Sequence, residues 1–537
     1  MNILIIGSGP SGVHFALSAL RKGHRVVMLD VGAARPAIAA PASDFLGLKR
    51  DLADPTEYFV GGDYGAISLP SAPGEATREY YGLPPSKDYV FARPQPFVVR
   101  EDGFSTLLSF AAGGLAESWT GGAYPLGPEE LADFPFTHAE LKPHYDEVAA
   151  RIGVGGLEDD LAEFFPHHDH LLAPIALDRS SAALLASYEA RRARLARKSG
   201  ARLGRSRQAA LSAAKDDRSG CRQCGRCLWG CPNGAFYTPS ITLAECRRHA
   251  AFDYRPGLFV SHFECAGGAL AGAMAYPLNG GAEERFTADA YVLAAGAISS
   301  SNIVLRSHFK ATGEIVRLEG LMDNRQVLAP FFNLAMLGKA YDAGSYQYHQ
   351  LACALPGEAG AEAVHAQITT MTTASAHPVL QSLPLDMRSA MGVFRLLRSG
   401  LGVVNLNFAD RRRAGNYLTL APEGDAWPAL SIRYRPPEGE AKMIRAALAR
   451  TGKFFADLGA PLIPGMAHIR PMGSSVHYSG TLPMSAEPRA WTVSRECRSH
   501  DFDNLYVIDG AAMPALPAKN LTFTLMANAV RVAEEAF

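Results

Sequence analysis

Three glycines close to the amino terminus constrain the fold more than any other feature of this sequence. The apolar run 2–6 leads into Gly7, Gly9 and Gly12, and a helical pattern and a second apolar run, 25–29, follow before Asp30. In such a unit the first glycine permits a tight turn, the second lets the backbone approach a pyrophosphate, and the third lets the helix pack on the strand. Asp30 lies 23 residues after Gly7, near the spacing of a carboxylate that holds a ribose diol. We therefore predict an α/β fold with a Rossmann-like dinucleotide-binding domain, which by itself does not separate FAD from NAD.

Length and charge set the class of partner. The chain has 537 residues, of which 48% are hydrophobic, and a formal net charge of −1. This is enough for two domains, and nothing in it indicates a nucleic-acid partner, so we expect a small-molecule substrate. The sequence starts directly on a strand pattern, without a charged leader or cleavage site, and has no transmembrane segment. We expect a cytoplasmic protein, with export on a signal-bearing partner subunit left open.

Two later segments favour FAD over NAD. Residues 290–307 give a strand, a turn at Gly296 and a helix, and residues 504–537 give a strand that ends at Asp509 and Gly510. In two-dinucleotide-binding flavoproteins, late strands of this kind return to the amino-terminal sheet beside the cofactor. A nucleotide-binding domain assembled from the start, middle and end of a chain is typical of large FAD enzymes.

Two carboxyl-terminal segments, 476–484 and 504–522, carry the strongest part of a resemblance to the glucose-methanol-choline (GMC) oxidoreductases, and this resemblance covers most of the chain. Residues 476–484, with His477, are similar to the segment that carries the first catalytic histidine of that family, and residues 504–522 to the segment with the second catalytic residue, here Asn520. The 43-residue separation suits this pair. Two departures are Leu521, where the family usually has proline, and Asp30, where glutamate is common. The resemblance implies an FAD-binding domain with an inserted antiparallel-sheet substrate domain.

The predicted pair has a chemical rationale. Hydride leaves an alcohol carbon readily only as the hydroxyl loses its proton, and a neutral imidazole can take that proton near neutral pH. His477 is our candidate base, and Asn520 would orient the same oxygen without titrating. Apolar residues from Leu521 to Val532 repeat at helical spacing, which places Asn520 at or near a helix N-cap.

The resemblance also assigns other parts of the chain. The stretch 112–122, with Gly113, Gly114 and Trp119, is similar to the family's glycine-rich stretch beside the flavin ring. The resemblance implies an FAD-binding domain at 1–309, a substrate-binding domain at 310–470 and a return to the FAD-binding domain at 471–537. Within the substrate domain, a group of polar and aromatic residues would suit a sugar: Tyr346, Gln347, His349 and Gln350.

A cysteine-rich loop at 221–240 indicates a second redox group. Its spacing is C-x2-C-x2-C-x3-C-P, that of bacterial iron-sulfur loops, and its cysteines are Cys221, Cys224, Cys227 and Cys231. We predict an iron-sulfur cluster, [4Fe-4S] or [3Fe-4S], held by four or three of these thiolates. Zinc, a disulfide and a metal-free loop stay open as alternatives. The loop resembles that of FAD-dependent sugar dehydrogenase catalytic subunits.

These observations together predict an FAD-dependent enzyme that oxidises an alcohol group of a sugar, polyol or sugar-derived substrate. Hydride would pass to flavin N5, and electrons would continue through the cluster to an external acceptor, either a protein or a quinone. Alternatives are an oxidase of the same family that uses oxygen and a non-redox lyase that keeps FAD. An electron-transfer module without an organic substrate is disfavoured, because it would leave His477 and Asn520 idle.

Overall fold

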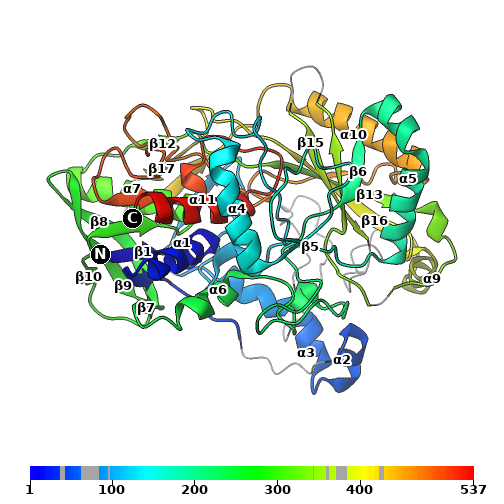
Figure 1. Cartoon of the computed structure of the whole chain (residues 1–537), viewed down its shortest axis with the longest axis horizontal. Coiled ribbons are helices and arrows are strands. Elements are labelled where there is room, and N and C mark those ends of the chain that lie inside the picture. The colour runs from blue at the N-terminus through cyan, green and yellow to red at the C-terminus, as the bar shows by residue number, and fades with distance from the viewer. Residues whose placement is uncertain are drawn as a thin grey trace.

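The computed structural model describes residues 1–36, 43–61, 84–94, 97–342, 344–357, 362–370, 384–421 and 428–537. Two lobes lie side by side (Figure 1). One contains both chain termini and a parallel sheet. The other contains an antiparallel sheet with the long helices α5 (Arg179–Ser199) and α10 (Glu440–Leu458).

The parallel sheet is built from four distant parts of the chain. Its order is β20 (Leu505–Val507), β11 (Ala290–Leu293), β1 (Asn2–Ile6), β2 (Arg25–Leu29) and β7 (Phe252–Arg255). All neighbouring pairs run parallel, and β1 lies between β2 and β11. The predicted α/β class and the return of the middle and last segments to the first strand are thus confirmed.

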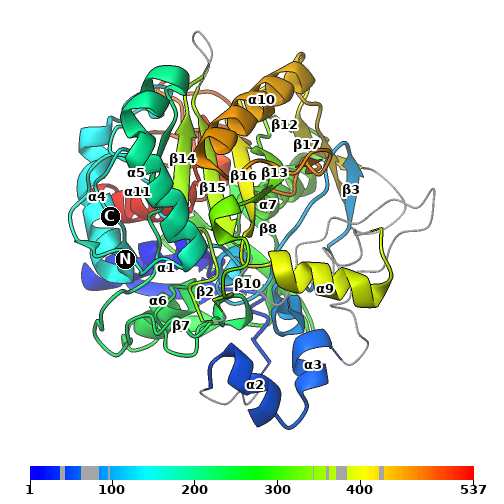
Figure 2. The same cartoon turned by 90° about the vertical axis from the view of Figure 1, so that its right-hand side faces the viewer.

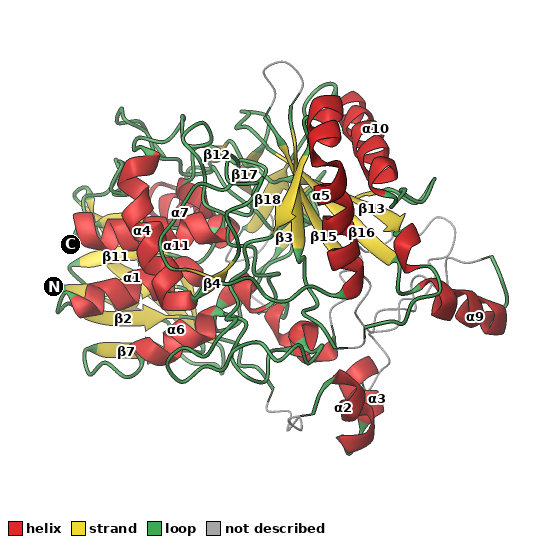
Figure 3. Cartoon of the chain, turned by 45° about the vertical axis from the view of Figure 1, so that its right-hand side comes forward, coloured by secondary structure: helices red, strands yellow, loops and turns green. Residues whose placement is uncertain are grey.

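Four helices of this lobe form a row in which each helix packs on the next. Helix α1 (Pro10–Arg21) contacts α6 (Pro239–Cys246) and α11 (Thr522–Glu535), and α11 contacts α4 (His138–Ile152) (Figure 3). Local sequence explains two of their starts. Pro10 fixes the φ angle of the first residue of α1. Helix α4 begins with a capping box, in which Thr137 accepts from the Glu140 amide and the Glu140 carboxylate accepts from the Thr137 amide.

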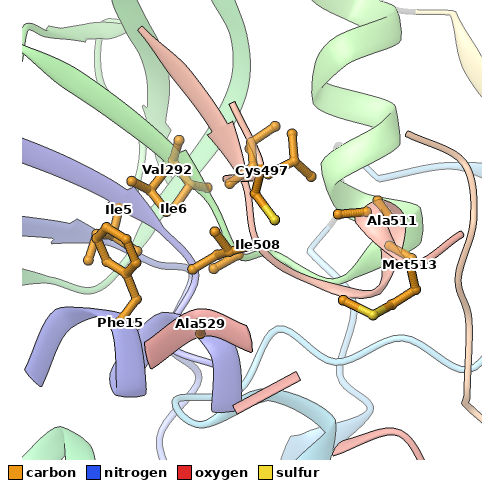
Figure 4. Close-up of a cluster of buried hydrophobic side chains, with 14 of the residues drawn as sticks. Ile5, Ile6, Phe15, Val292, Cys497, Ile508, Ala511, Met513 and Ala529 are labelled. Carbon is orange, nitrogen blue, oxygen red and sulfur yellow. The ribbon is translucent and has the colours of Figure 1, made fainter. Parts of the chain in front are cut away.

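Side chains from these segments share one hydrophobic core (Figure 4). Ile5, Val292 and Ile508 are fully buried, and they come from the start, middle and end of the chain. Phe15 of α1 and Ala529 of α11 close the same cluster. Since burying one such large apolar side chain stabilises the fold by about 1.5–3 kcal/mol, the core fixes the three segments to one another.

Smaller sheets border the parallel sheet. One is antiparallel, with strands β8 (Leu258–Ala266), β9 (Ala269–Pro277) and β10 (Glu284–Phe286), and helix α7 (Ala297–Thr312) lies against β8. Another has the order β12 (Arg317–Glu319), β17 (Tyr417–Ala421), β18 (Ala429–Arg433) and β3 (Val99–Asp102). The short strands β4 (Val154–Gly155) and β5 (Leu171–Leu172) form a pair.

The second lobe is organised around a six-stranded antiparallel sheet. Its order is β19 (His468–Ile469), β13 (Arg325–Phe332), β16 (Leu401–Phe408), β15 (Val364–Thr370), β14 (Leu351–Leu355) and β6 (Arg202–Arg205). Helices α5 and α10 pack together and on this sheet, with a core of their own. Strands from both sides of residue 309 therefore join one sheet, and the predicted domain limits stay a prediction.

Three shorter helices lie at the periphery (Figure 2). They are α2 (Phe45–Asp51), α3 (Pro55–Val60) and α9 (Met387–Leu397). The α2–α3 segment is attached to the cysteine loop, because the Phe45 amide donates to the Cys224 carbonyl at 2.9 Å and the Phe45 ring packs 5.0 Å from Trp229. Across the described ranges, no helix combines the length and the apolar character needed to cross a membrane.

Candidate active site

A cavity of about 480 Å³ connects the glycine loop with the predicted catalytic pair. It is lined by residues of both lobes. Among its walls are most of the residues predicted to bind the dinucleotide or to act on substrate: Gly7, Gly9, Asp30, Gly114, Trp119, Gly296, His477, Asp509, Gly510 and Asn520. The structure thus brings together side chains from the two ends of the chain. Gly12 and Gly113 lie behind this surface.

Close backbone packing explains why Gly12 and Gly113, behind the cavity wall, are glycines. A Cβ added to Gly12 would lie 2.1 Å from the Gly7 carbonyl oxygen, so α1 can start directly against the turn only with glycine there. The Gly113 amide donates to the Ser8 hydroxyl at 2.9 Å, with φ of 94° at Gly113. A Cβ on Gly114 would lie 3.3 Å from the Gly9 Cα. The two glycine-rich stretches, 7–12 and 112–122, therefore abut each other at one end of the cavity.

This end of the cavity has the chemistry of a dinucleotide site. Helix α1 begins at Gly9 with no side-chain cap, which leaves amide groups and the positive end of the helix dipole available to a pyrophosphate. Asp30, at the end of β2, lines the cavity and accepts from the hydroxyls of Ser8 and Tyr254. Burial raises the pKa of Asp30 to about 6. These residues fit FAD, with the pyrophosphate at α1 and the ribose at Asp30.

Asp509 has a different task from that of Asp30. Its carboxylate accepts from the Gly296 amide at 2.9 Å, the Ser300 hydroxyl at 2.5 Å and the Ala511 amide at 2.9 Å. These bonds join the start of α7 to the segment after β20. Next to it, a Cβ on Gly510 would lie 2.2 Å from the Tyr478 carbonyl oxygen. Asp509 and Gly510 thus hold the segment that contains His477 and Tyr478 close to the parallel sheet.

His477 is buried and touches two side-chain amides. Its Nδ1 lies 2.8 Å from Asn324 Oδ1, and its Nε2 lies 3.2 Å from Asn520 Nδ2. Burial, together with the positive charge of Arg470, lowers the pKa of His477 to about 4. The imidazole is therefore neutral at pH 7, which is the form that can accept a proton.

The segment that carries His477 is held in a strained conformation. Val476 has φ of 58°, a left-handed value that is costly for a β-branched residue. Buried Asp323 compensates, because its carboxylate accepts from the Gly473 amide at 2.7 Å, from the His477 amide at 3.2 Å and from the Ser475 hydroxyl. Sequence reasoning missed Asp323 and Asn324. They lie about 150 residues before His477 and form no local motif.

Asn520 lies beside the helix start, as expected, but its side chain does not cap the helix. Helix α11 has Leu521 as its N-cap residue and no side-chain cap. The Asn520 amide instead faces His477, while its Oδ1 accepts from Gln367 Nε2 of β15. The carboxyl-terminal helix and the antiparallel sheet together fix this side chain.

The expected sugar-binding group does not line the cavity. Tyr346 donates to Gln208 Oε1 at 2.6 Å, Gln347 accepts from the Leu228 amide, and Gln350 donates to the Tyr346 carbonyl. These side chains and His349 are buried and hold the chain together below the cavity wall. Polar residues from the antiparallel sheet and beside it take their place: Gln326, Gln367, Asn405 and Arg470. A prediction of the lining residues requires knowledge of which strand faces the cavity, and the local sequence does not show this.

The cysteine loop forms a separate small cavity. Cys221, Cys224, Cys227 and Cys231 line it together with Phe236 and Tyr346. Within the part of the chain that the structure describes, no three His, Cys, Asp or Glu side chains are arranged to hold one metal ion. Burial raises the pKa of the first three thiols, which disfavours the thiolate form that binds metals. The arrangement does not fit a preformed metal site, and the iron-sulfur cluster is not supported.

Comparison with known proteins adds family information. Residues 412–529 match the family model described as GMC oxidoreductase. The chain is 26% identical over 427 residues to 6'''-hydroxyparomomycin C oxidase of Streptomyces lividus, covering 74% of this chain and 71% of the relative. It is 22% identical to the fructose dehydrogenase large subunit of Gluconobacter japonicus, over 99% and 97% of the two chains.

Solved structures share the whole fold. Pyridoxine 4-oxidase from Mesorbium loti superimposes with a TM-score of 0.62 at 16% identity, over 99% of this chain and 98% of that one. Formate oxidase from Aspergillus oryzae RIB40 gives a TM-score of 0.61 at 12% identity, over 99% and 97%. At these identities the likeness establishes the fold alone.

Proposed function

Because the chain belongs to the GMC oxidoreductases, we propose that it uses bound FAD to oxidise an alcohol group of a sugar or another polyol. The observation that carries this proposal is the pair of His477 and Asn520 in the wall of the cavity that begins at the glycine loop. A buried neutral imidazole beside an amide is suited to remove a hydroxyl proton.

The residues act on one hydroxyl oxygen of the substrate. The Nε2 lone pair of His477 takes the hydroxyl proton, and Asn520 Nδ2, 3.2 Å from that nitrogen, donates to the same oxygen. When bound, FAD supplies the acceptor for the hydride that leaves the carbon. The strained but fixed segment at Val476 keeps the imidazole in place throughout, which avoids the entropic cost of positioning it.

The walls beyond the pair support a hydroxyl-rich substrate. Gln326, Gln367 and Asn405 present amides from neighbouring strands, and amides can both donate to and accept from hydroxyl groups. Asn405 Oδ1 has no hydrogen-bond partner in the described structure although it is buried. A substrate hydroxyl would satisfy it. Relatives named for a paromomycin derivative, a propanediol and fructose are consistent with such a substrate.

The test is anaerobic mixing of the holoenzyme with a panel of sugars and polyols while the flavin absorbance is followed. We expect bleaching by at least one of these, and His477→Ala should slow it by at least a thousandfold with FAD still bound. His468→Ala, an exposed histidine on β19, is the matched control. Equal bleaching by the two variants would remove His477 from the mechanism. Product formation without bleaching would favour a lyase.

The electron acceptor is a separate proposal. The relatives include proteins named as oxidases and as dehydrogenases, so both oxygen and an external protein or quinone are candidates. We propose a dehydrogenase, on the resemblance of the cysteine loop to that of sugar dehydrogenase subunits. Reoxidation by a quinone analogue at more than ten times the rate in air would support this. Hydrogen peroxide formation matching substrate loss would establish the oxidase instead.

The iron-sulfur cluster is kept as a hypothesis on its cysteine spacing alone. No step of the reaction above depends on it. Iron and sulfide analysis of protein purified without oxygen decides it, with zinc measured in the same sample. Absence of iron from the anaerobic sample would leave the loop a structural element between the α2–α3 segment and the cavity.

A further inference from the structure

A histidine that accepts a proton must present a lone pair to the substrate. In a neutral imidazole one nitrogen carries hydrogen and the other does not, and the partner of the remote nitrogen decides which. For His477 the remote nitrogen is Nδ1, and its partner is Asn324. The inference below rests on the proposed role of His477 as base.

The orientation of the Asn324 amide is fixed by the backbone around it. Asn324 Nδ2 lies 2.8 Å from the Phe408 carbonyl oxygen and 3.0 Å from the Pro517 carbonyl oxygen. Carbonyl oxygens can only accept, so the group that faces them must be the NH₂. A flipped amide would place its oxygen against both carbonyls and lose two buried hydrogen bonds. Asn324 is 1% exposed, so water cannot replace them.

It follows that the amide oxygen of Asn324 must face His477. This oxygen has only lone pairs to offer, so the imidazole atom 2.8 Å away must be an N–H. We propose that Asn324 is a positioning residue, which holds His477 as the Nδ1–H tautomer so that the Nε2 lone pair faces the substrate hydroxyl.

On the opposite side of the ring, Asn520 takes the orientation that matches this tautomer. Gln367 Nε2 donates to Asn520 Oδ1, which leaves Asn520 Nδ2 to face His477 Nε2. An unprotonated Nε2 can accept from this NH₂, whereas an Nε2–H would meet it donor against donor. Asn324 therefore determines the tautomer, and the orientation of Asn520 is compatible with it.

The choice of an amide over a carboxylate matters for the proton affinity of the base. A carboxylate beside Nδ1 would favour the charged imidazolium, while an amide oxygen fixes the tautomer without adding charge. The charged or titratable groups near the ring are Asp323, which accepts from the His477 amide, Arg470, and His365, a second neutral histidine. Nδ1 itself lies 2.8 Å from the uncharged Asn324 Oδ1.

The first experiment replaces the acceptor. Asn324→Leu keeps the approximate size but removes the oxygen, and we expect kcat for flavin reduction to fall 30- to 100-fold with KM within threefold. Asn324→Asp restores an acceptor and adds a negative charge. It should therefore shift the acid limb of the kcat/KM profile to higher pH, by at least one pH unit. Asn416→Leu is the matched control, because it removes a buried side-chain amide that accepts from the Arg435 backbone amide, just after β18.

The second experiment observes the tautomer in the unaltered holoenzyme. The protein is labelled with 15N-histidine, and the His477 signals are assigned by their loss in His477→Gln. Protonated Nδ1 with unprotonated Nε2 supports the proposal, and protonated Nε2 overturns it whether or not the variants fold. An unmoved acid limb in Asn324→Asp, or equal kcat for Asn324→Leu and Asn416→Leu, also overturns it. Failure of the proposed function gives a different result from failure of this inference. In that case the flavin of His477→Ala would be reduced by the substrate as fast as that of the unaltered protein.

Discussion

Substitution of Gly12 by alanine tests how the amino-terminal loop holds FAD. The added methyl carbon would lie 2.1 Å from the Gly7 carbonyl oxygen and 3.3 Å from the Ala294 Cβ. The first distance is more than 1 Å shorter than an ordinary carbon–oxygen contact of about 3.3 Å. The obstructing atom belongs to the backbone of the same turn. Relief therefore requires the start of α1 to move away from Gly7.

The size of the effect follows from what that movement breaks. Helix α1 has no side-chain cap, so its first amides are the groups available to the pyrophosphate. A hydrogen bond to a charged group contributes about 1.5–3 kcal/mol. Loss of one such bond predicts about 1.5–3 kcal/mol weaker binding, which is about 10- to 150-fold in the FAD dissociation constant. The fold should survive, because the core side chains around Phe15 are unchanged.

Titration of the apoprotein with FAD, followed by flavin fluorescence, measures this constant. Gly392→Ala is the matched control, since Gly392 lies in helix α9 and a Cβ there meets no atom within 4 Å. We expect the control to bind FAD as the unaltered protein does. Binding by Gly12→Ala within threefold of the control, with unchanged circular dichroism, would refute the argument that the loop geometry holds the pyrophosphate.

Three further predictions concern buried ionisable groups. The pKa of His477 is lowered to about 4 by burial, so the acid limb of kcat/KM should lie near pH 4 rather than near 6.5, and a limb above 6 would contradict this. The pKa of Asp30 is raised to about 6 in the protein without FAD, and ribose hydroxyls favour its carboxylate. FAD affinity should therefore rise with pH up to about 6 and then level off, and Asp30→Asn should abolish this dependence in FAD titrations. Asp323→Ala leaves buried donors at residues 473–477 without their acceptor and should cost about 3 kcal/mol in urea unfolding with a large loss of kcat; a loss below 1 kcal/mol would argue against the role assigned to Asp323.

The sequence was sufficient to predict the nucleotide-binding half of the molecule. The glycine loop, Asp30 and the returning strands are local patterns whose periodicity and turn chemistry determine their structure directly. The inserted antiparallel sheet was also expected, and all of its strands except β6 lie within the predicted range 310–470. What failed was the choice of cavity residues at 346–350. A short polar stretch gives no information on which side of it faces the cavity.

The residues around His477 show why a catalytic pair predicted from sequence is incomplete. Asp323 and Asn324 follow β12 and directly precede β13, and they reach the base across the junction of two sheets. Their positions depend on the tertiary fold, because no local pattern brings residue 324 to residue 477. Only the assembled structure shows that Asp323 bonds the backbone amide of His477 and that Asn324 bonds its Nδ1.

The same contacts join the two lobes at the point where chemistry is proposed. Asn324 is bonded to Phe408 of the antiparallel sheet and to Pro517 of the segment that leads to Asn520 and α11. A shift of the antiparallel sheet relative to the parallel one would therefore move Asn324 and release the proton on His477 Nδ1 from its acceptor. The tautomer that we propose for His477 thus depends on an amide held by backbone groups from two distant segments.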